Sequence, residues 1–177
     1  MPTSALKASR PERSPLPNGT TLKLRSLDTE NELTLITKCT ITGLLSKEGG
    51  SGLVYEATDD YNTTIKGKER NLIIKECYPL ARVEVGGSEK SLASLLIRDP
   101  KSNELAINED LEESWKLEAT KVFEDYKQHF KDAFNWHSIN AADAQNHTAP
   151  LLGFSEENNT VYIISSRQEG HVPQRLL

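Results

Sequence analysis

The sequence predicts an α+β domain in which a five-stranded antiparallel sheet packs against one long helix. Strand-like apolar segments separated by turn residues occupy the first half of the 177-residue chain, an amphipathic segment follows, and a further pair of strand-like segments flanks a turn near the end. Short connections between successive strands favour antiparallel pairing, and an amphipathic helix can cover one face of such a sheet. The length suits about one domain.

The first three strands are expected before the helix. Apolar residues alternate or cluster among Thr and Ile over residues 22–45, which predicts one or two strands. A turn over 47–52 precedes a short strand at 53–57, and the polar connection 59–70 leads to another strand at 71–75.

The helix is predicted over residues 111–135. Its apolar residues recur at spacings of three and four and form one stripe, made of Leu111, Trp115, Ala119, Val122, Tyr126, Phe130 and Phe134. After it, the apolar segments 151–154 and 161–164 flank the turn-forming Glu157-Asn158-Asn159, which indicates a hairpin.

The remaining segments are expected to be less regular. Residues 1–20 carry four of the eight prolines with Ser, Arg, Asn and Gly, a composition that buries too little apolar surface to offset the entropy of ordering. We therefore expect a disordered leader over 1–20 and a folded domain over 21–177. Residues 81–110 contain two glycines, a proline and many polar residues, and predict a loop with a little local structure.

Charge and composition argue against several classes of function. The net charge is −5 with acidic and basic residues interspersed, so no polybasic stripe indicates nucleic acid or an anionic membrane as a partner. No apolar run resembles a signal peptide or a membrane span, which leaves the cytoplasm as the expected compartment. Two cysteines and four histidines show no metal-ligand spacing, so no metal site is expected.

A glycine cluster between two predicted strands is the most informative segment. Gly49, Gly50 and Gly52, with Ser51 between them, fall at a hairpin tip. Glycines let the backbone approach an anion closely, so that amide N–H groups face phosphates. The same cluster is typical of an ordinary turn, and both interpretations remain open for the segment on its own.

Lys75 is the second candidate residue. It is the only cation in 71–76 and ends the apolar run Leu72-Ile73-Ile74, which is expected on a central strand. A lysine there either extends to water or meets a negative partner.

The predicted helix offers such a partner. With Trp115 at the centre of the apolar stripe, Glu118 falls about 60° from that centre, at the edge of the buried face. A solvated glutamate beside an amphipathic stripe is the alternative interpretation.

Together these residues resemble the small lobe of a protein kinase of the bacterial serine/threonine type. Gly49-Gly50-Ser51-Gly52-Leu53-Val54 matches the second and third glycines and the valine of the kinase glycine-rich loop, although Lys47 stands where the first glycine belongs. Leu72-Ile73-Ile74-Lys75 resembles the kinase Val-Ala-Ile-Lys strand. The resemblance covers residues 38–172.

The resemblance implies an ATP site. The glycine loop and Val54 would enclose the nucleotide, and Lys75 would hold the α- and β-phosphates and pair with Glu118. Ser165 would be the gatekeeper, and Ser166 to Gln168 would offer backbone groups to adenine. The implied cofactor-binding set is Gly49, Gly50, Ser51, Gly52, Val54, Lys75, Glu118, Ser166 and Gln168.

The sequence lacks the remaining kinase motifs. Neither a His-Arg-Asp catalytic loop nor an Asp-Phe-Gly occurs, and Leu177 follows just after the implied hinge. The resemblance therefore implies a small lobe that is truncated after the hinge and has no catalytic residue of its own. Magnesium would bind only if a separate large lobe supplied its ligands, and no kinase activity is expected from the chain alone.

Two other functions compete with a nucleotide-binding lobe. One is a non-catalytic, pseudokinase-like interaction module that binds another protein through the surface a large lobe normally covers. The other is an unrelated α+β domain whose glycines are coincidental. Binding of ATP that depends on Lys75 separates the first function from these two.

Overall fold

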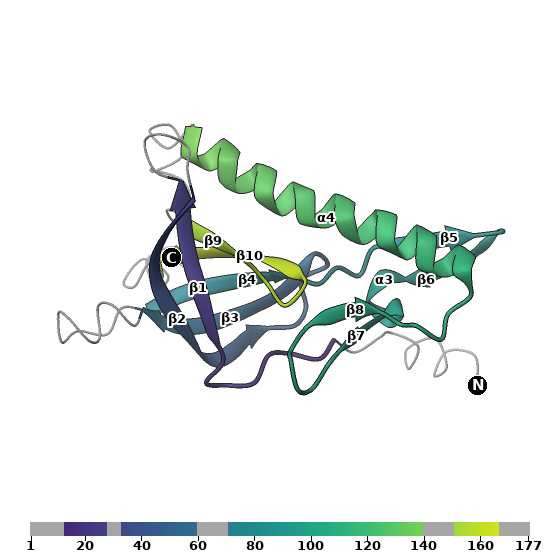
Figure 1. The fold of residues 1–177 in the computed structure, drawn as a ribbon, viewed down its shortest axis with the longest axis horizontal. Helices are drawn as coiled ribbons and strands as arrows, with labels where there is room; N and C mark the ends of the chain where they lie inside the picture. Colours follow the sequence, from purple (N-terminus) through teal and green to yellow (C-terminus); the bar gives the residue numbers. More distant parts are fainter. Residues whose placement is uncertain (1–12, 28–32, 60–70, 140–150, 167–177) are drawn as a thin grey trace, which may run out of the picture.

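Six strands form the centre of the molecule. The computed structural model describes residues 13–27, 33–59, 71–139 and 151–166. The strands are β1 (Thr21–Leu27), β2 (Leu33–Ser46), β3 (Gly52–Asp59), β4 (Asn71–Cys77), β9 (Leu151–Glu157) and β10 (Thr160–Ser166). They pair in the order β1-β2-β3-β4-β10-β9 and close into an antiparallel barrel (Figure 1).

The barrel has one strand more than the sequence predicted. Segment 22–45 supplies most of two strands, β1 and β2, which pair with each other. The opposite edge of β1 meets β9, where Arg25 lies opposite Phe154, so the sheet closes on itself and the expected number of five strands is wrong. Closure removes the two unpaired edges that an open sheet would expose.

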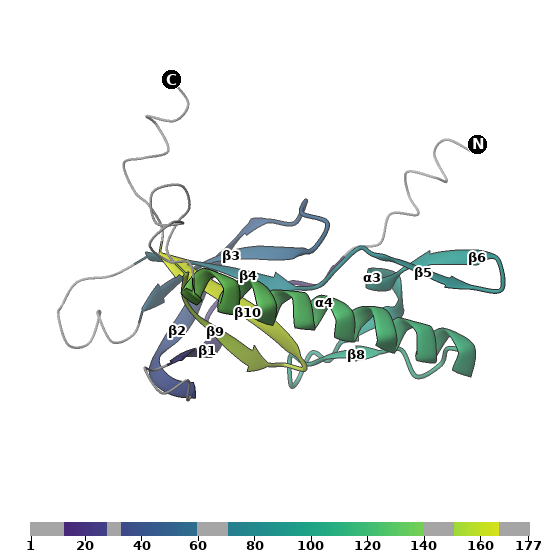
Figure 2. The same ribbon diagram turned by 90° about the horizontal axis from the view of Figure 1, so that it is seen from above.

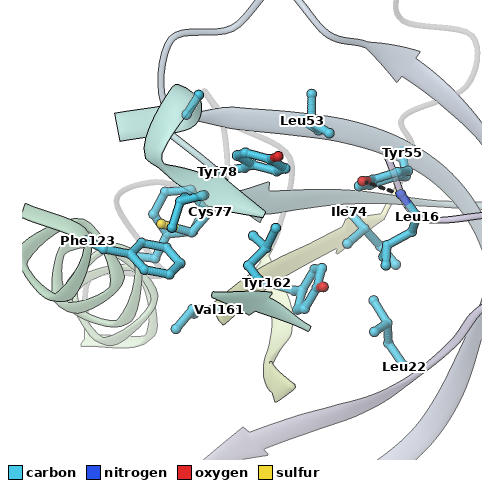
Figure 3. Close-up of a cluster of buried hydrophobic side chains, with 14 of the residues drawn as sticks. Leu16, Leu22, Leu53, Tyr55, Ile74, Cys77, Tyr78, Phe123, Val161 and Tyr162 are labelled. Carbon is cyan, nitrogen blue, oxygen red and sulfur yellow. Dashed lines mark hydrogen bonds between the residues drawn. The ribbon is translucent and has the colours of Figure 1, made fainter. Parts of the chain in front are cut away.

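Side chains alternate between the barrel interior and its outside. On β4, Leu72, Ile74 and Glu76 are fully buried, whereas Ile73 and Lys75 are half-buried. The same period of two applies to β3, where Tyr55 and its neighbours on the same face fill the interior beside Leu22 of β1 and Tyr162 of β10 (Figure 3). Adjacent residues of one strand therefore meet entirely different surroundings.

The hairpin after the helix is confirmed. Strands β9 and β10 pair through Thr160 opposite Glu157, with Asn158 and Asn159 at the turn. Both asparagines adopt positive φ, 55° and 59°, as a two-residue hairpin loop requires and as asparagine tolerates better than most residues.

The single long helix is also confirmed. It is α4 (Glu113–Ile139), which begins two residues later than expected and continues past residue 135. Its C-terminal half packs on β4, β9 and β10, and its N-terminal half extends beyond the barrel (Figures 1 and 2). Among the described residues no helix has the length and apolar character needed to cross a membrane.

The segment expected to be a loop, residues 81–110, is more regular than predicted. It forms two short antiparallel ribbons and one helical turn beneath the N-terminal half of α4. These elements are β5 (Arg82–Val85), β6 (Ser88–Ser91), α3 (Leu92–Leu95), β7 (Leu96–Arg98) and β8 (Leu105–Ile107). Val83, Leu92 and Leu105 are buried there, which extends the core away from the barrel.

Residues 13–20, which we call the strap, correct the expectation of a disordered leader ending at residue 20. The side chain of Leu16 is buried in the core, and its backbone N–H donates to the Tyr55 hydroxyl at 3.0 Å. Proline-rich composition did not reveal this anchoring because its partners lie far along the chain. Residues 1–12 of the expected leader lie outside the described residues.

Candidate functional site

Val54 of β3, Lys75 of β4 and the expected gatekeeper Ser165 of β10 share one face, the outer face, which points away from the barrel interior. Its first cross-strand row is Val54–Lys75–Ile163, and its second is Glu56–Ile73–Ser165. All six side chains are half-buried, in contrast to the buried interior face. The pairing register therefore brings Val54 beside Lys75 and the expected gatekeeper Ser165 beside Ile73.

Lys75 makes an aromatic contact on this face. Its ammonium nitrogen lies 5.7 Å from the centroid of the Phe130 ring on α4. A cation beside an aromatic ring gains about 0.5–1 kcal/mol at a partly exposed site. Within the described part of the chain, the Lys75 side chain has no carboxylate or other hydrogen-bonding partner, so its charge is weakly compensated.

The glycine hairpin between β2 and β3 is held through its carbonyl groups. The N–H groups of Tyr78 and Leu80 donate to the carbonyl oxygens of Ser51 and Gly50 at 3.1 and 2.7 Å. The carbonyls of Lys47 and Gly52 accept from the Arg13 guanidinium at 2.6 and 3.3 Å. Four carbonyl groups around the tip thus face donors of the protein.

This arrangement leaves amide groups on the other side of the hairpin. In a trans peptide the C=O and the following N–H point in opposite directions, so the N–H groups of Ser51 and Gly52 point away from residues 78–80. No described residue accepts a hydrogen bond from the N–H of Gly49, Gly50 or Ser51. Adjacent backbone N–H groups of this kind form a concavity that attracts anions.

Gly52 has a structural reason to be glycine. A Cβ atom at this position would lie 1.7 Å from the backbone oxygen of Glu76. Gly49 and Gly50 are exposed, and an added Cβ atom meets nothing closer than 3.3 Å at Gly49 and nothing within 4 Å at Gly50. The glycine cluster therefore combines strand packing at Gly52 with an open tip at Gly49 and Gly50.

The structure does not bring Glu118 to Lys75. The Glu118 carboxylate pairs with Lys121 one turn further along α4, at 3.2 Å. Phe130, which contacts Lys75, lies twelve residues beyond Glu118, or about 18 Å along the helix axis. Helical periodicity correctly placed Glu118 at the edge of the buried face of α4. It could not predict where along the helix axis β4 passes α4.

A lysine lies close to where the helix meets the sheet. Lys127 is buried, its ammonium group donates to the carbonyl of Asn159 at 3.3 Å, and it pairs with Glu124 at 2.7 Å. Its nitrogen lies 4.5 Å from the centroid of the Phe123 ring. The stretch of α4 that packs on the sheet therefore presents Phe123, Lys127 and Phe130.

The structure gives little information on the two predicted hinge residues, Ser166 and Gln168. Ser166 ends β10 opposite Leu72 of β4. Gln168 lies outside the described residues.

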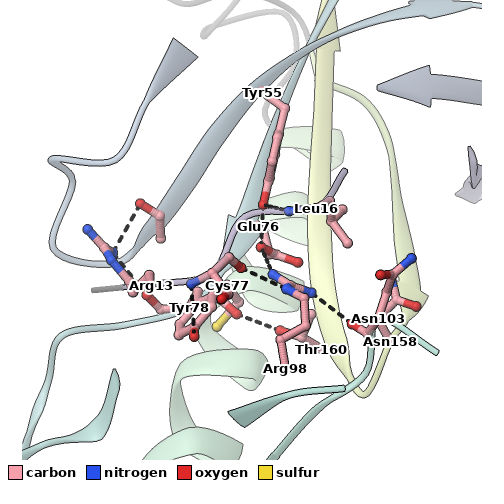
Figure 4. A network of polar contacts seen from close by, with 12 residues as sticks. Arg13, Leu16, Tyr55, Glu76, Cys77, Tyr78, Arg98, Asn103, Asn158 and Thr160 are labelled. Atoms are coloured by element: carbon pink, nitrogen blue, oxygen red, sulfur yellow. Dashed lines mark hydrogen bonds and ion pairs between the residues drawn. The ribbon is translucent and has the colours of Figure 1, made fainter. Parts of the chain in front are cut away.

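A buried ionic cluster on the interior side of β4 was missed by sequence reasoning. The Glu76 carboxylate accepts from the Tyr55 hydroxyl at 2.7 Å and the Arg98 guanidinium at 2.6 Å (Figure 4). It also accepts from the Tyr162 hydroxyl at 2.5 Å. Arg98 also donates to the carbonyls of Ser14 and Asn103. Because Glu76 shares the parity of Leu72 and Ile74, strand alternation was the signal that could have placed it inside.

Burial and the Glu76 charge together perturb the cluster. Burial, followed by the nearby carboxylate, raises the pKa of Tyr162 well above its ordinary value, and the same two causes raise the pKa of Tyr55. Burial alone would lower the pKa of Arg98, but the adjacent Glu76 carboxylate raises it overall. The cluster is thus a compensated ion pair with two neutral phenols, and its polar atoms are occupied by one another.

Neither a metal-binding cluster among the described residues nor a similar known protein identifies a function for these residues. Across the described ranges, no three His, Cys, Asp or Glu side chains gather in a way that could hold a metal ion. Comparison with protein-family models, curated proteins and solved structures finds no significant match to this chain.

Proposed function

We propose that this chain binds the phosphates of ATP at the glycine hairpin and Lys75, as the small lobe of a serine/threonine protein-kinase-like protein. The observation that carries the proposal is the group of N–H donors of Gly49, Gly50 and Ser51, which have no acceptor among the described residues, at the start of the strand that pairs with Lys75. Lys75 has no anionic partner there. Val54, opposite Lys75, lies two residues from Gly52, or about 7 Å along β3. Such a spacing suits a polyphosphate chain.

The order of elements supports the kinase-like interpretation. Strands β2, β3 and β4 precede α4, and β9 and β10 follow it, as the resemblance implies. The register also pairs Val54 with Lys75, the residues that the resemblance assigns to the nucleotide and to its phosphates. Strand β1, which closes the barrel, is an addition to that pattern.

The proposal does not include phosphoryl transfer by this chain alone. Transfer requires a catalytic aspartate and magnesium ligands, and the sequence contains neither His-Arg-Asp nor Asp-Phe-Gly. We propose that a separate large lobe would supply both. In that arrangement Lys75 would have to leave the Phe130 ring to meet the phosphates.

A non-catalytic interaction module is the second candidate, and one observation favours it. An active kinase needs an ion pair between its strand lysine and a helix glutamate. Here Glu118 pairs with Lys121, and α4 presents Phe130 to Lys75. A module that retains the scaffold without catalysis needs no such pair.

Calorimetric titration with ATP and magnesium tests the proposal. The wild-type protein should bind, and Lys75→Ala should weaken the affinity at least about tenfold, the effect of losing a charge-assisted contact. Lys101→Ala, in an exposed turn away from the outer face, is the matched control and should bind as the wild type does. Absence of binding at millimolar ATP would favour the interaction module.

A further inference from the structure

Hydrogen bonds of residues after Arg13 anchor the strap to the rest of the protein. The N–H of Gly19 donates to the carbonyl of Ile41 at 2.7 Å, and the N–H of Leu16 donates to Tyr55. The Ser14 carbonyl accepts from the buried Arg98 guanidinium at 2.7 Å. The path of the strap is therefore fixed by residues 14–19.

Arg13, at the start of the strap, connects both arms of the glycine hairpin. One terminal nitrogen donates to Lys47 before the tip, and the other donates to Gly52 after it and to Tyr78 at 3.0 Å (Figure 4). The side chain is buried although it carries a full charge. A guanidinium group suits this position because its planar fork reaches several acceptors at once, which a single ammonium group does not do with the same geometry.

We infer that Arg13 is a positioning residue that sets the phosphate affinity of the glycine hairpin by holding its carbonyl groups toward the strap. The carbonyls of Gly50 and Ser51, bound by the N–H groups of Leu80 and Tyr78, direct the following N–H groups outward. Arg13 fixes the two ends of this loop at Lys47 and Gly52, which pre-organises the N–H groups that would receive a phosphate. The effect on affinity rests on the proposed function. The bonds from Arg13 to Lys47 and Gly52, which we call the clamp, are a property of the free protein and do not depend on the proposed function.

Hydrogen exchange of the free protein tests the clamp. In Arg13→Gln and Arg13→Lys, exchange of the Tyr78 and Leu80 amides, which donate to the Ser51 and Gly50 carbonyls of the hairpin, should accelerate at least about tenfold. The amides of Leu16 and of β4 should keep their wild-type rates. The matched control is Arg82→Gln, because the Arg82 side chain is 79% exposed and pairs with Glu89 across the β5–β6 ribbon. Unchanged exchange of the Tyr78 and Leu80 amides, or a uniform increase across the barrel, would overturn the clamp.

Titration of the same variants with ATP and magnesium tests the effect on affinity. Both Arg13 variants should bind about tenfold more weakly than the wild type, because positioning depends on the fork and not on the charge alone. Arg13→Lys with wild-type affinity would show that Arg13 acts only as a positive charge, and would overturn the inference. Wild-type protein that fails to bind ATP would overturn the proposed function and the claimed effect on affinity, whatever the exchange result.

Discussion

Lys75 and Glu76 are neighbours in β4, yet they occupy two opposite regions of the molecule. Glu76 points into the barrel, is fully buried and accepts hydrogen bonds from two tyrosines and an arginine. Lys75 points to the outer face, is half-buried and contacts one aromatic ring. Because side chains alternate along a strand, the charge of Glu76 has a complete set of partners and the charge of its neighbour Lys75 does not.

The contrast teaches which charge serves stability and which is available for binding. A buried carboxylate with three donors cannot receive a ligand unless the core opens, and losing it leaves its partners uncompensated. A half-buried ammonium held by a weak contact can change partners at small cost. Mutations in the two regions should therefore differ in both size and kind.

Glu76→Ala should have the largest effect on stability. It leaves the Arg98 guanidinium buried without its counter-charge, so the free energy of unfolding should fall by about 3–5 kcal/mol. Urea denaturation followed by circular dichroism measures the change. Glu84→Ala, an exposed glutamate on β5, is the control and should stay within about 0.5 kcal/mol of the wild type. Equal effects of the two substitutions would contradict the assigned role of Glu76.

Gly52→Ala should come next. The new Cβ atom would overlap the Glu76 backbone oxygen, which forces β3 and β4 apart and should cost about 1–3 kcal/mol. Gly50→Ala places its Cβ atom in open space and should leave the melting temperature nearly unchanged. If both variants melted alike, the close approach of the two strands would not explain why Gly52 is glycine.

Alkaline pH should weaken the barrel by a smaller amount. Burial raises the pKa of the Cys77 thiol from 9.0 to about 12, and burial also raises the pKa values of Tyr55 and Tyr162. These groups hold their protons more tightly in the folded state, so their contribution is complete below pH 9 and is lost as the pH rises toward 12. Between pH 9 and 10 Cys77 alone should cost roughly 1 kcal/mol.

Unfolding titrations at a series of pH values measure this loss. Cys77→Ala should flatten the fall between pH 9 and 10 relative to the wild type. A wild-type stability that stays constant up to pH 11 would contradict the buried, neutral state of these groups.

Lys75→Ala should have the smallest effect on stability. Only the contact with Phe130 is lost, so the free energy of unfolding should change by less than about 1 kcal/mol. Thermal denaturation provides the measurement, with Glu76→Ala as the reference for a charge lost from the same strand. A destabilisation as large as that of Glu76→Ala would mean that Lys75 is a structural residue.

Sequence patterns predicted the elements whose signals are local. The stripe of α4 and the turn at Asn158 and Asn159 depend on residues close together in the chain, and both were found as expected. Barrel closure depends on Arg25 of β1 meeting Phe154 of β9, more than a hundred residues away, and no local pattern encodes that pairing. The ribbons of residues 81–110 were missed because their strands contain only three or four residues.

In the candidate site, too, the contacts that follow from local patterns were predicted and those that depend on the tertiary fold were not. Lys75 and Val54 were expected on one surface and share a cross-strand row because strand parity is readable from sequence. The expected partner Glu118 lies too far along α4 because the crossing point of a helix depends on the loops that lead to it. Arg13 and Arg98 carry no local signal, since Arg13 binds Lys47, 34 positions away, and Arg98 binds Glu76, 22 positions away.

The central claim is that the hairpin N–H groups and Lys75 receive the same phosphate chain. Titration of ¹⁵N-labelled protein with ATP, followed by amide chemical shifts, tests it most directly. We expect the largest shifts at Gly49, Gly50 and Ser51, and their loss in Lys75→Ala. Shifts confined to other surfaces, or shifts at the hairpin that persist unchanged in Lys75→Ala, would contradict the claim.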